Sequence, residues 1–254
     1  MPESHRHDDK VVIVTGGSQG VGLGICRAFL HDGASVVSCA RTPFEHCPAA
    51  ENENERSRSM HVQADIRNDD DIDHVIAATL DRFGRLDVLV NNAGGQPPAD
   101  IATVSPRFIR AIVELNLTAP MIFAAKAYRV MSEQESGGCV INISSQASMP
   151  SGGGGSLVPY GAAKAGLNHM TRSLAVAWGR KVRVNCISLG WVETEAMSDL
   201  LLPQNREQWN TTIERIPVGR MGTPDEIGGL CTFLASNAAS YLNSTTIWAD
   251  GDAT

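Results

Sequence analysis

The feature that most limits how this chain can fold is an alternation of short, mostly apolar strands with amphipathic helical segments. Residues 11–14 (VVIV), 86–90 (LDVLV) and 139–144 (CVINIS) are strands of this kind. A strand that is apolar at nearly every position is buried on both faces, which is typical of a parallel sheet covered by helices on both sides. Between the strands, residues 72–83 repeat apolar side chains at helical spacing. The sequence therefore predicts a doubly wound α/β fold with about seven parallel strands.

Three connecting segments have their own expectations. A long helix is expected from about Ser105 to Met131, with a bend at Pro120. Residues 42–59 (TPFEHCPAAENENERSRS) occupy a crossover position but are polar and contain two prolines, so they predict a poor helix. Residues 151–156 (SGGGGS) predict a mobile loop, because a run of glycines has high chain entropy.

The length of the chain and the absence of a linker favour one domain. The 254 residues are 43% hydrophobic, which is enough for one large core, and we find no internal repeat and no linker between domains. We expect a single cofactor-binding and catalytic domain over residues 10–254. Residues 1–9 are polar and are expected to form a disordered tail that leaves His5 and His7 in solvent.

Composition argues against several classes of protein. The net charge is −7 and the sequence has no long Lys/Arg cluster, so nucleic-acid binding is not expected. No apolar run approaches the ~18 residues of a membrane span, and the amino terminus does not resemble a signal peptide. Six scattered cysteines without CxxC spacing are interpreted as reduced thiols of a cytoplasmic protein, with no metal.

A glycine-rich turn, Thr15–Gly22 (TGGSQGVG), joins the first strand to the first helix. Such a turn lets backbone N–H groups approach a pyrophosphate, whose charge the helix amino terminus favours. The alternative is a tight connection that only needs positive φ. Because the turn follows the first strand of a parallel sheet, it predicts dinucleotide binding. The residues expected to contact the cofactor here are Gly16, Ser18, Gln19, Gly20, Val21 and Gly22.

The end of the second strand bears on the type of dinucleotide. Sites that prefer NAD usually have an acidic residue near this point, which bonds the ribose 2′-hydroxyl. Here the sequence is Cys39-Ala40-Arg41. Since no carboxylate would repel a 2′-phosphate and Arg41 can pair with one, NADP(H) is favoured over NAD(H). Arg41 stacked on adenine, or merely solvated, is the alternative.

Tyr160 and Lys164 stand four residues apart in the segment PYGAAKAG. On a helix this spacing places both side chains on one face, one turn apart. An ammonium beside a phenol favours the phenolate, so the pKa of Tyr160 is expected to fall and the residue to serve as a proton donor. A surface tyrosine and a solvated lysine would show the same spacing.

Five motifs in this order resemble the short-chain dehydrogenase/reductase family, in its compact single-domain form. The resemblance covers about residues 10 to 252 and rests on the following segments: TGGSQGVG, NNAG (91–94), LNLT with Asn116, NISS with Ser145, and YGAAK with Tyr160 and Lys164. Each motif alone is weak, but the ordered set is specific. The resemblance implies a Rossmann-type sheet and an NAD(P)-dependent oxidoreductase acting on a carbonyl or an alcohol.

The resemblance also implies roles for four catalytic residues. Tyr160 would be the general acid toward a carbonyl oxygen, or the base toward an alcohol. Lys164 would hold the nicotinamide ribose hydroxyls and lower the Tyr160 pKa, and both residues would contact the cofactor. Ser145 would hydrogen-bond the substrate oxygen, with Ser144 as the alternative hydroxyl. Asn116 would anchor a water that links Lys164 to a proton relay, or be an ordinary polar helix residue.

Further cofactor contacts follow from the same resemblance. Asp65 would meet the adenine amino group, unless it simply caps the next helix. Asn91 and Ala93 would flank the adenosine ribose, and Thr194 would contact the nicotinamide carboxamide. The remaining expected contacts are Ile66, Gly94, Gly190 and Val192.

The chain departs from the family pattern at three places. A Leu189-Gly190 pair replaces the usual Pro-Gly pair, and Asn243-Ser244 stands where a Thr-Gly turn is common. Ser145 and Tyr160 are about two residues further apart than usual, with the surplus in the glycine-rich loop. The second departure is compatible with a turn, and the third affects the shape of the pocket.

The substrate is expected under a lid at about residues 191–216. This segment contains Met197, Leu200, Leu201, Leu202, Trp209 and Ile213. An apolar lid favours an apolar substrate such as a ketone, a 3-oxoacyl group, a steroid-like molecule or a terpenoid. Alternatively, the same residues are ordinary core or an interface. An enoyl thioester reductase and a catalytically silent nucleotide-binding sensor or scaffold are the other hypotheses for function. Like its relatives, the chain is expected to form a homotetramer or homodimer through its two long helices and last strand.

Overall fold

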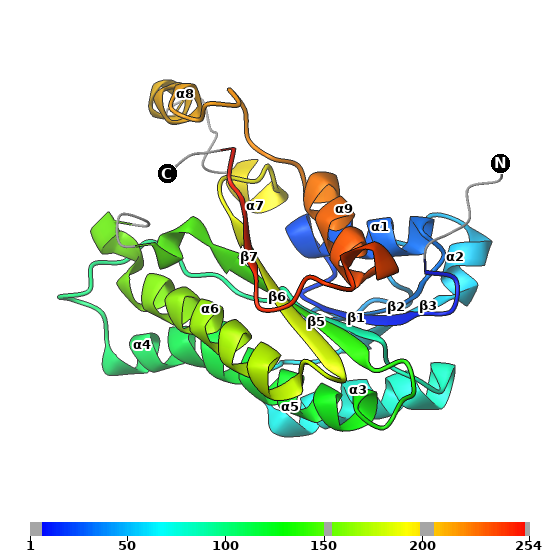
Figure 1. The fold of residues 1–254 in the computed structure, drawn as a ribbon. Coiled ribbons are helices and arrows are strands. Elements are labelled where there is room, and N and C mark those ends of the chain that lie inside the picture. Colours follow the sequence, from blue (N-terminus) through cyan, green and yellow to red (C-terminus); the bar gives the residue numbers. More distant parts are fainter. Residues whose placement is uncertain (1–6, 150–153, 199–205, 252–254) are drawn as a thin grey trace.

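A computed structural model describes residues 7–149, 154–198 and 206–251 of the chain. At its centre is a sheet of seven strands in the order β3-β2-β1-β4-β5-β6-β7, and every neighbouring pair is parallel. Helices cover both sides of the sheet (Figure 1). The predicted doubly wound, Rossmann-type fold is therefore confirmed.

The elements follow the predicted alternation. The strands are β1 (Val11–Thr15), β2 (Ser35–Ala40), β3 (Ser59–Gln63), β4 (Val88–Asn91), β5 (Gly138–Ser145), β6 (Val182–Leu189) and β7 (Thr246–Ala249). The helices are α1 (Gly20–His31), α2 (Glu53–Ser57), α3 (Asp69–Phe83), α4 (Pro106–Val113), α5 (Ala119–Met131), α6 (Val158–Trp178), α7 (Glu195–Ser198), α8 (Arg206–Glu214) and α9 (Pro224–Ala235).

Two hydrophobic clusters, one on each face, hold the helices to the sheet. On one face, α1 and α9 pack through residues such as Phe29, Ile227 and Leu234. On the other, α3 and α5 pack through residues such as Ile72 and Phe123. The inner strands β1, β2, β4, β5 and β6 are buried throughout or nearly so, whereas the edge strands β3 and β7 are only partly buried.

The predicted long helix is a continuous segment with a wider turn in its middle. A π-helical turn, Glu114–Thr118, joins α4 to α5. Pro120 follows it at the start of α5. A proline has no N–H to give to the carbonyl four residues earlier, here that of Asn116, and its ring would crowd that carbonyl in an α-helix. The expected bend at Pro120 thus takes the form of a π turn centred on Asn116.

The same segment corrects the expectation that no stretch of the chain is apolar enough to span a membrane. By length and composition alone, Pro106–Met131 is apolar enough to cross a membrane, although 33% of that stretch is buried inside the protein. In the fold it covers the sheet, with Phe123, Ala127 and Met131 fully buried. Its place against the sheet therefore explains part of its apolar character.

Two other connecting segments match their expectations in part. The crossover after β2 contains only a five-residue helix, α2, so the prediction of a poor helix is confirmed. Residues 150–153 of the glycine-rich loop lie outside the described residues. Gly154–Leu157 form a 3₁₀ turn, and the Ser156 carbonyl accepts hydrogen bonds from Gln96 Nε2 and Ala99 N, both at 3.0 Å.

The expectation of a solvated His7 is wrong. His7 is 1% exposed, its ring packs against Phe29, and its Nε2 lies 3.0 Å from the Thr232 carbonyl. Its backbone N–H also donates to Asp32 O. These contacts join the start of the chain to α9, more than two hundred residues away, and no local pattern reveals them. Residues 1–6, the rest of the predicted tail, lie outside the described residues.

Candidate active site

The candidate site lies at the carboxyl ends of the central strands. In a parallel sheet these ends share one edge, and the loops that follow β1, β4, β5 and β6 meet there. The glycine-rich turn, the NNAG segment, Ser145 and Gly190 stand directly after those four strands. The topology therefore brings together the motifs that the sequence spreads over 180 residues.

The glycine-rich turn adopts the backbone that its sequence suggests. Gly16 and Gly20 have φ angles of 66° and 53°, in the left-handed region where glycine carries no steric penalty. Thr15 Oγ1 accepts hydrogen bonds from the N–H groups of Asn92 and Ala93, each at 2.9 Å. The turn is thereby joined to the loop after β4. The predicted residues Ser18, Gln19 and Val21 lie on the same turn, none of them fully buried.

The amino terminus of α1 is in contact with a carboxylate, that of Glu195. The Gly20 N–H donates to Glu195 Oε2 at 3.1 Å, across 175 residues of sequence. The Gln19 side chain makes no capping hydrogen bond to this helix. A carboxylate at the first turn of a helix is stabilised by the unpaired N–H groups and the helix dipole, and a phosphate is stabilised in the same way. The turn therefore has the donor geometry that a pyrophosphate needs.

The loop after β6 closes over this turn. A side chain added at Gly20 would come within 3.3 Å of Thr194 Cγ2. Gly190 donates its N–H to Ala249 O at 3.0 Å and lies against Asp250, so a β-carbon there would collide with Asp250. The structure thus brings the predicted residue Thr194 to the glycine-rich turn, and it places Gly190 against the end of β7.

Tyr160 and Lys164 lie on one face of α6, as their spacing predicted. The Lys164 Nζ is 5.6 Å from the centroid of the Tyr160 ring and donates a hydrogen bond to Ile143 O at 2.7 Å. Ser145, at the end of β5, hydrogen-bonds the Tyr160 hydroxyl. Lys164 is 3% exposed, so the alternative of a solvated surface lysine is excluded.

Asn116 lies close to Lys164, with Gly94 between them. It is fully buried in the π turn, and its Nδ2 donates to Gly95 O at 3.1 Å and to Ile112 O at 2.9 Å. In return, Gly95 N–H donates to Asn116 Oδ1 at 2.9 Å. A β-carbon on Gly94 would lie 2.6 Å from that Oδ1 and 3.1 Å from Lys164 Nζ. Only glycine at position 94 therefore lets Asn116 and Lys164 approach each other from two different helices.

Burial is the largest influence on the pKa values of Tyr160 and Lys164. Burial raises the pKa of Tyr160, and the hydrogen bond from Ser145 opposes this rise only in part. Burial also lowers the pKa of Lys164 to about 8. The expectation of a lowered Tyr160 pKa is therefore wrong. Its physical reason is that both groups are removed from water, which disfavours the charged form of each.

The two candidate serines have different surroundings. Ser144 is 2% exposed and its Oγ donates to Lys164 O at 3.3 Å, so it ties α6 to β5. Ser145 is only partly buried, and its Oγ accepts the Ala147 N–H at 3.2 Å while it faces Tyr160. Ser145 is thus the hydroxyl that can reach a substrate.

At the adenosine end, the segment after β2 is held by the side chains of β3. Gln63 Nε2 donates to Arg41 O at 3.0 Å, and His61 Nε2 lies 2.9 Å from Thr42 O. The Arg41 side chain is exposed. It is therefore placed on a fixed backbone and open to solvent, which fits a contact with a charged ligand.

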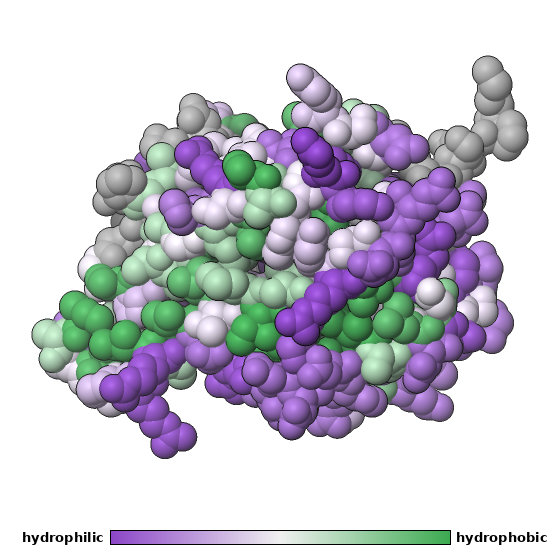
Figure 2. Space-filling model, turned by 60° about the horizontal axis from the view of Figure 1, so that its bottom comes forward, coloured by the Kyte–Doolittle hydropathy of each residue, from purple (hydrophilic) through white to green (hydrophobic). Residues whose placement is uncertain are grey.

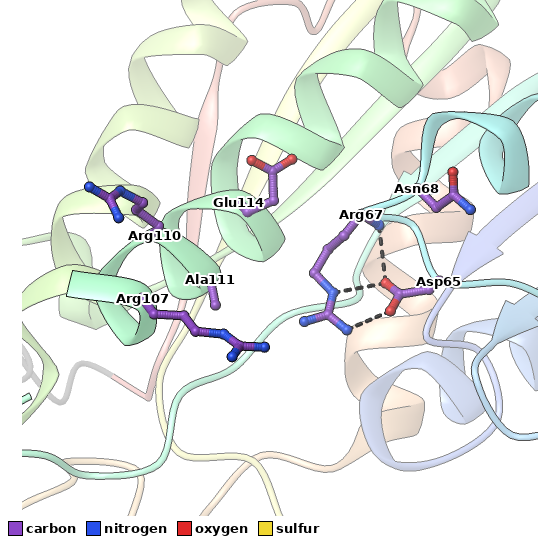
Figure 3. A pocket seen from close by; sticks show the side chains of 7 residues that line it. All are labelled: Asp65, Arg67, Asn68, Arg107, Arg110, Ala111 and Glu114. Atoms are coloured by element: carbon purple, nitrogen blue, oxygen red, sulfur yellow. Dashed lines mark hydrogen bonds and ion pairs between the residues drawn. The ribbon is translucent and has the colours of Figure 1, made fainter. Parts of the chain in front are cut away.

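Asp65 is paired with Arg67. Arg67 Nε donates to Asp65 Oδ1 at 2.9 Å, and this contact lowers the pKa of the carboxyl. The alternative that Asp65 caps the next helix is wrong, because the Asn68 side chain caps α3. Beside this pair is a cavity of about 560 Å³ between the loop after β3 and α4 (Figure 3). In Figure 3, Arg67 turns toward Asp65, while Arg107 and Arg110 project from α4 on the opposite wall.

Three predicted cofactor residues have buried side chains. Asn91 is 2% exposed, and its Nδ2 donates to Asn142 Oδ1 and to Pro120 O. Ile66 and Val192 are 5% and 7% exposed and belong to the two core clusters. Their burial leaves the backbone groups of these three residues as the ones available to a ligand, and their predicted contact with the cofactor stays a prediction. Ala93 and Gly94 lie less deeply, next to the glycine-rich turn.

Two residues that contribute to the site were missed in the sequence. Gln96 Oε1 accepts the Tyr160 N–H at 3.1 Å, so Gln96 fixes the start of α6. Glu195 binds the Gly20 N–H as described above. The Gln directly after NNAGG, and the Glu directly after Thr194, are adjacent to recognised motifs. That adjacency is the only signal, since their partners are 64 and 175 residues away.

The described part of the predicted lid segment contains α7 and α8. Trp191 and Trp209 meet edge to face, with ring centroids 4.9 Å apart. Met197 and Ile213 are partly buried. Leu200, Leu201 and Leu202 lie outside the described residues, so the predicted apolar lining stays a prediction there.

Comparisons with known proteins agree with this geometry. Residues 16–254 match the family described as "Enoyl-(Acyl carrier protein) reductase". A crystal structure of a short chain dehydrogenase from Bacillus anthracis superposes with a TM-score of 0.84 at 34% identity, covering 96% of each chain. This chain belongs to the short-chain dehydrogenase/reductase family. The Rossmann-type sheet and the ordered motifs are those of this family.

Two curated relatives differ in what they act on. The chain is 35% identical over 259 residues to the L-fucose dehydrogenase of Oryctolagus cuniculus, covering 100% of this chain and 88% of that protein. It is 33% identical over 250 residues to a Bacillus subtilis protein named a probable 2,4-dienoyl-CoA reductase, covering 96% of each. One relative is named for a sugar, L-fucose, and the other for a dienoyl-CoA, so similarity alone does not assign the substrate.

Proposed function

We propose that this short-chain dehydrogenase/reductase transfers a hydride between NADP(H) and a carbonyl or secondary alcohol. The observation that carries the proposal is the convergence of Ser145, Tyr160, Lys164 and Asn116 from three elements at one end of the sheet. A silent sensor or scaffold has no need of this complete set, because nucleotide binding requires only the glycine-rich turn and its neighbours.

The residues would act as follows during reduction of a carbonyl. The bound nicotinamide supplies the hydride. Tyr160 gives its hydroxyl proton to the carbonyl oxygen, and Ser145 hydrogen-bonds the same oxygen and stabilises its developing charge. Lys164 holds the nicotinamide ribose and, as a cation, draws the Tyr160 pKa down once the site is assembled. Asn116 connects Lys164 to the route by which Tyr160 regains a proton.

The preference for NADP(H) rests on the segment after β2. Arg41 is exposed on a backbone held by Gln63, and residues 39–42 contain no carboxylate. A guanidinium there can pair with a 2′-phosphate. The fucose dehydrogenase relative supports alcohol or carbonyl chemistry. The aromatic and apolar residues of the lid support an apolar substrate such as a ketone, 3-oxoacyl, steroid-like or terpenoid compound.

Reduction of a C=C bond in an enoyl thioester is the second candidate. The description of the matched family and the Bacillus subtilis relative favour it. The two candidates differ in the group that accepts the hydride, and they share the cofactor site.

We also propose that the protein assembles as a homodimer or homotetramer in the cytoplasm. Figure 2 shows a band of hydrophobic surface across the side of the molecule covered by α4, α5 and α6. Met121 of α5 and Val176 of α6 are 42% and 84% exposed. Exposed apolar side chains on a helical face fit a contact with a second copy. The six cysteines are free, which fits a reducing compartment.

The decisive experiment is a substrate panel with a matched active-site variant. The reduced nicotinamide is followed by its near-ultraviolet absorbance with apolar ketones, sugars and enoyl thioesters. We expect ketone reduction, and a loss of roughly 100-fold or more in kcat for Tyr160→Phe, which removes only the proton donor. NADPH affinity should stay within about twofold of the wild type, because the phenyl ring is kept. Equal turnover in the variant would overturn the assignment of Tyr160. Turnover of enoyl thioesters alone would favour the second candidate.

A further inference from the structure

Two buried thiols from distant elements meet below the glycine-rich turn. Cys26 lies on α1, and Cys47 lies in the irregular crossover between β2 and α2. They are 0% and 2% exposed, and the two thiols hydrogen-bond each other. Residues 41–46, which lead into Cys47, are all exposed. Both cysteines are free.

Cys47 has surroundings that stabilise a thiolate. Its sulfur accepts hydrogen bonds from the backbone N–H groups of Ala49 and Ala50, in the short turn that Pro48 begins, and it also hydrogen-bonds Ser38. These hydrogen bonds, with the one from Cys26, lower the pKa of Cys47 to about 7 despite its burial. Burial raises the pKa of Cys26 instead. The backbone N–H groups of Ala49 and Ala50 favour Cys47, of the two thiols, as the one that reacts first.

A hydrogen-bond chain leads from Cys47 to the segment that carries Arg41. Ser38 Oγ lies 2.8 Å from His61 Nδ1, and His61 Nε2 lies 2.9 Å from Thr42 O. A carbonyl can only accept, so Nε2 carries the hydrogen and Nδ1 of the neutral ring accepts from Ser38. In this arrangement Ser38 can only accept from the Cys47 S–H. It supports a Cys47 thiolate when its one hydrogen turns to the sulfur instead, which is the contact that lowers the pKa of Cys47.

We propose that Cys47 and Cys26 form a peroxide-reactive thiol pair, which closes to a disulfide and thereby weakens dinucleotide binding. The effect on dinucleotide binding rests on the proposed function, whereas the thiol chemistry does not depend on it.

The reaction balances with a hydroperoxide as the oxidant. The Cys47 thiolate attacks one peroxide oxygen, the O–O bond breaks, and Cys47 becomes a sulfenic acid while the other oxygen leaves as water after taking up a proton. The Cys26 sulfur then attacks the Cys47 sulfur, and the S–O bond breaks. The leaving hydroxide takes the Cys26 proton and departs as water. Overall, two thiols and one hydrogen peroxide give one disulfide and two waters.

The position of the pair explains why cofactor binding should change. A β-carbon on Gly17 would lie 2.8 Å from Cys26 Sγ and 2.9 Å from Ser38 Cβ, so the turn rests directly on these two side chains. A disulfide bond is much shorter than a thiol–thiol hydrogen bond, so Cys47 must move toward Cys26. This movement ends the hydrogen bond between Cys47 and Ser38. It also pulls on the crossover that begins at Arg41.

The experiment treats the full-length reduced protein with hydrogen peroxide, removes the excess, and maps the cysteines by mass spectrometry. We expect a loss of two hydrogens from the intact mass and a peptide pair that joins Cys26 to Cys47. In Cys26→Ser we expect a sulfenic acid at Cys47 that dimedone traps. Cys47→Ser should form neither product, and its hydroxyl can keep the hydrogen bonds from Ala49 and Ala50. Cys139→Ser, which removes another buried thiol, should oxidise like the wild type. Dimedone trapping elsewhere, or no disulfide between these two residues, would overturn the proposal.

Dinucleotide binding is measured on the same samples. We expect NADPH to bind about tenfold more weakly to the oxidised wild type, equivalent to about 1.4 kcal/mol, and dithiothreitol to restore the affinity. Cys47→Ser should show no change with peroxide. If the disulfide forms and NADPH affinity is unchanged, the coupling is disproved. If the reduced protein fails to bind any dinucleotide, the proposed function fails, whereas the mass measurements still decide the thiol chemistry.

Discussion

Lys164 shows, at the scale of a single residue, how strongly burial determines the chemistry of this site. Its ammonium is 3% exposed, and a carbonyl, Ile143 O, accepts its hydrogen bond. No carboxylate is among the groups that shift its pKa, which falls to about 8. A phosphate-bearing cofactor and a Tyr160 phenolate would both supply the missing negative charge. The site is thus prepared for an anionic ligand and becomes electrostatically balanced only when one binds.

This burial predicts a pH dependence of stability. Below pH 8 both the folded and the unfolded chain carry the Lys164 proton, and the buried charge destabilises the folded state. As the pH rises from 8 toward 10.5, the folded protein loses this proton while the unfolded chain keeps it. The penalty therefore disappears over this window. Lys164→Met has no such group. Relative to it, the wild type should gain up to about 3 kcal/mol, at 1.36 kcal/mol per pKa unit. Urea denaturation of both proteins at several pH values measures the difference, and a constant difference would contradict the account.

Arg41 gives a second prediction at this scale. Arg41→Ala should weaken NADPH binding about tenfold, as expected for the loss of a charge-assisted hydrogen bond, and leave NADH binding nearly unchanged. Arg56→Ala is the control, since Arg56 is a solvent-exposed arginine that ends α2 and pairs with Glu53. Fluorescence titrations of both variants measure the affinities. A similar loss for the two cofactors would mean that Arg41 contacts a group which both contain.

At the scale of elements, the unusual backbone conformations of this chain lie in the connections between its regular strands and helices. The π turn at Glu114–Thr118 allows Asn116 to bond both Ile112 and Gly95. The turn before β7 contains Ser244 with a φ of 66°, the one positive φ outside glycine among residues 7–149, 154–198 and 206–251. Asn243 supports this turn through hydrogen bonds with Val184 N and Ala175 O.

Ser244 predicts a stabilising substitution. A non-glycine residue in the left-handed region costs about 1–2 kcal/mol, and the greater chain entropy of glycine offsets part of that gain. Ser244→Gly should therefore raise the free energy of unfolding by about 0.5–1 kcal/mol. Ser240→Gly is the matched control, because Ser240 has a φ of −57° and should lose stability. Urea denaturation of both variants measures this. Destabilisation by Ser244→Gly would contradict the account.

The sequence was informative wherever a signal is local. Apolar strands, helical repeats and the spacing of Tyr160 and Lys164 predicted the sheet and the shared helix face, because these depend on residues close together in the chain. The burial of His7, the pairing of Asp65 with Arg67 and the carboxylate of Glu195 on Gly20 were not predicted. Each depends on which side chains meet after folding. The raised pKa of Tyr160 was missed for the same reason, since desolvation depends on everything packed around the group.

At the scale of the whole molecule, the exposed apolar face of α5 and α6 is the main feature unexplained by a single chain. Within Pro106–Met131, 33% of an apolar 18-residue window is buried inside the protein, so most of that window is not buried by the chain itself. Tyr128 and Trp178 stack at 4.4 Å between ring centroids across these two helices. A second copy placed on this face would cover the band visible in Figure 2.

This predicts that a charge on the face prevents assembly. Val176→Glu should reduce the sedimenting mass by at least half, because an unpaired carboxylate would be buried at the centre of the contact. Phe44→Glu places the same charge on another exposed hydrophobic residue, 43% exposed in the β2–α2 crossover, and should leave the mass unchanged. Analytical ultracentrifugation compares the three proteins. An unchanged mass for Val176→Glu would show that assembly uses a different surface.

The central claim is that the end of the sheet marked by Gly20, Ser145 and Tyr160 is a site for a nicotinamide dinucleotide. The most direct test is a fluorescence titration of the purified wild type with NADPH and, separately, with NADH. The account predicts saturable binding of both at one site per chain, with NADPH the tighter ligand. If neither dinucleotide binds, the glycine-rich turn is only a tight connection between strand and helix, and the account is contradicted.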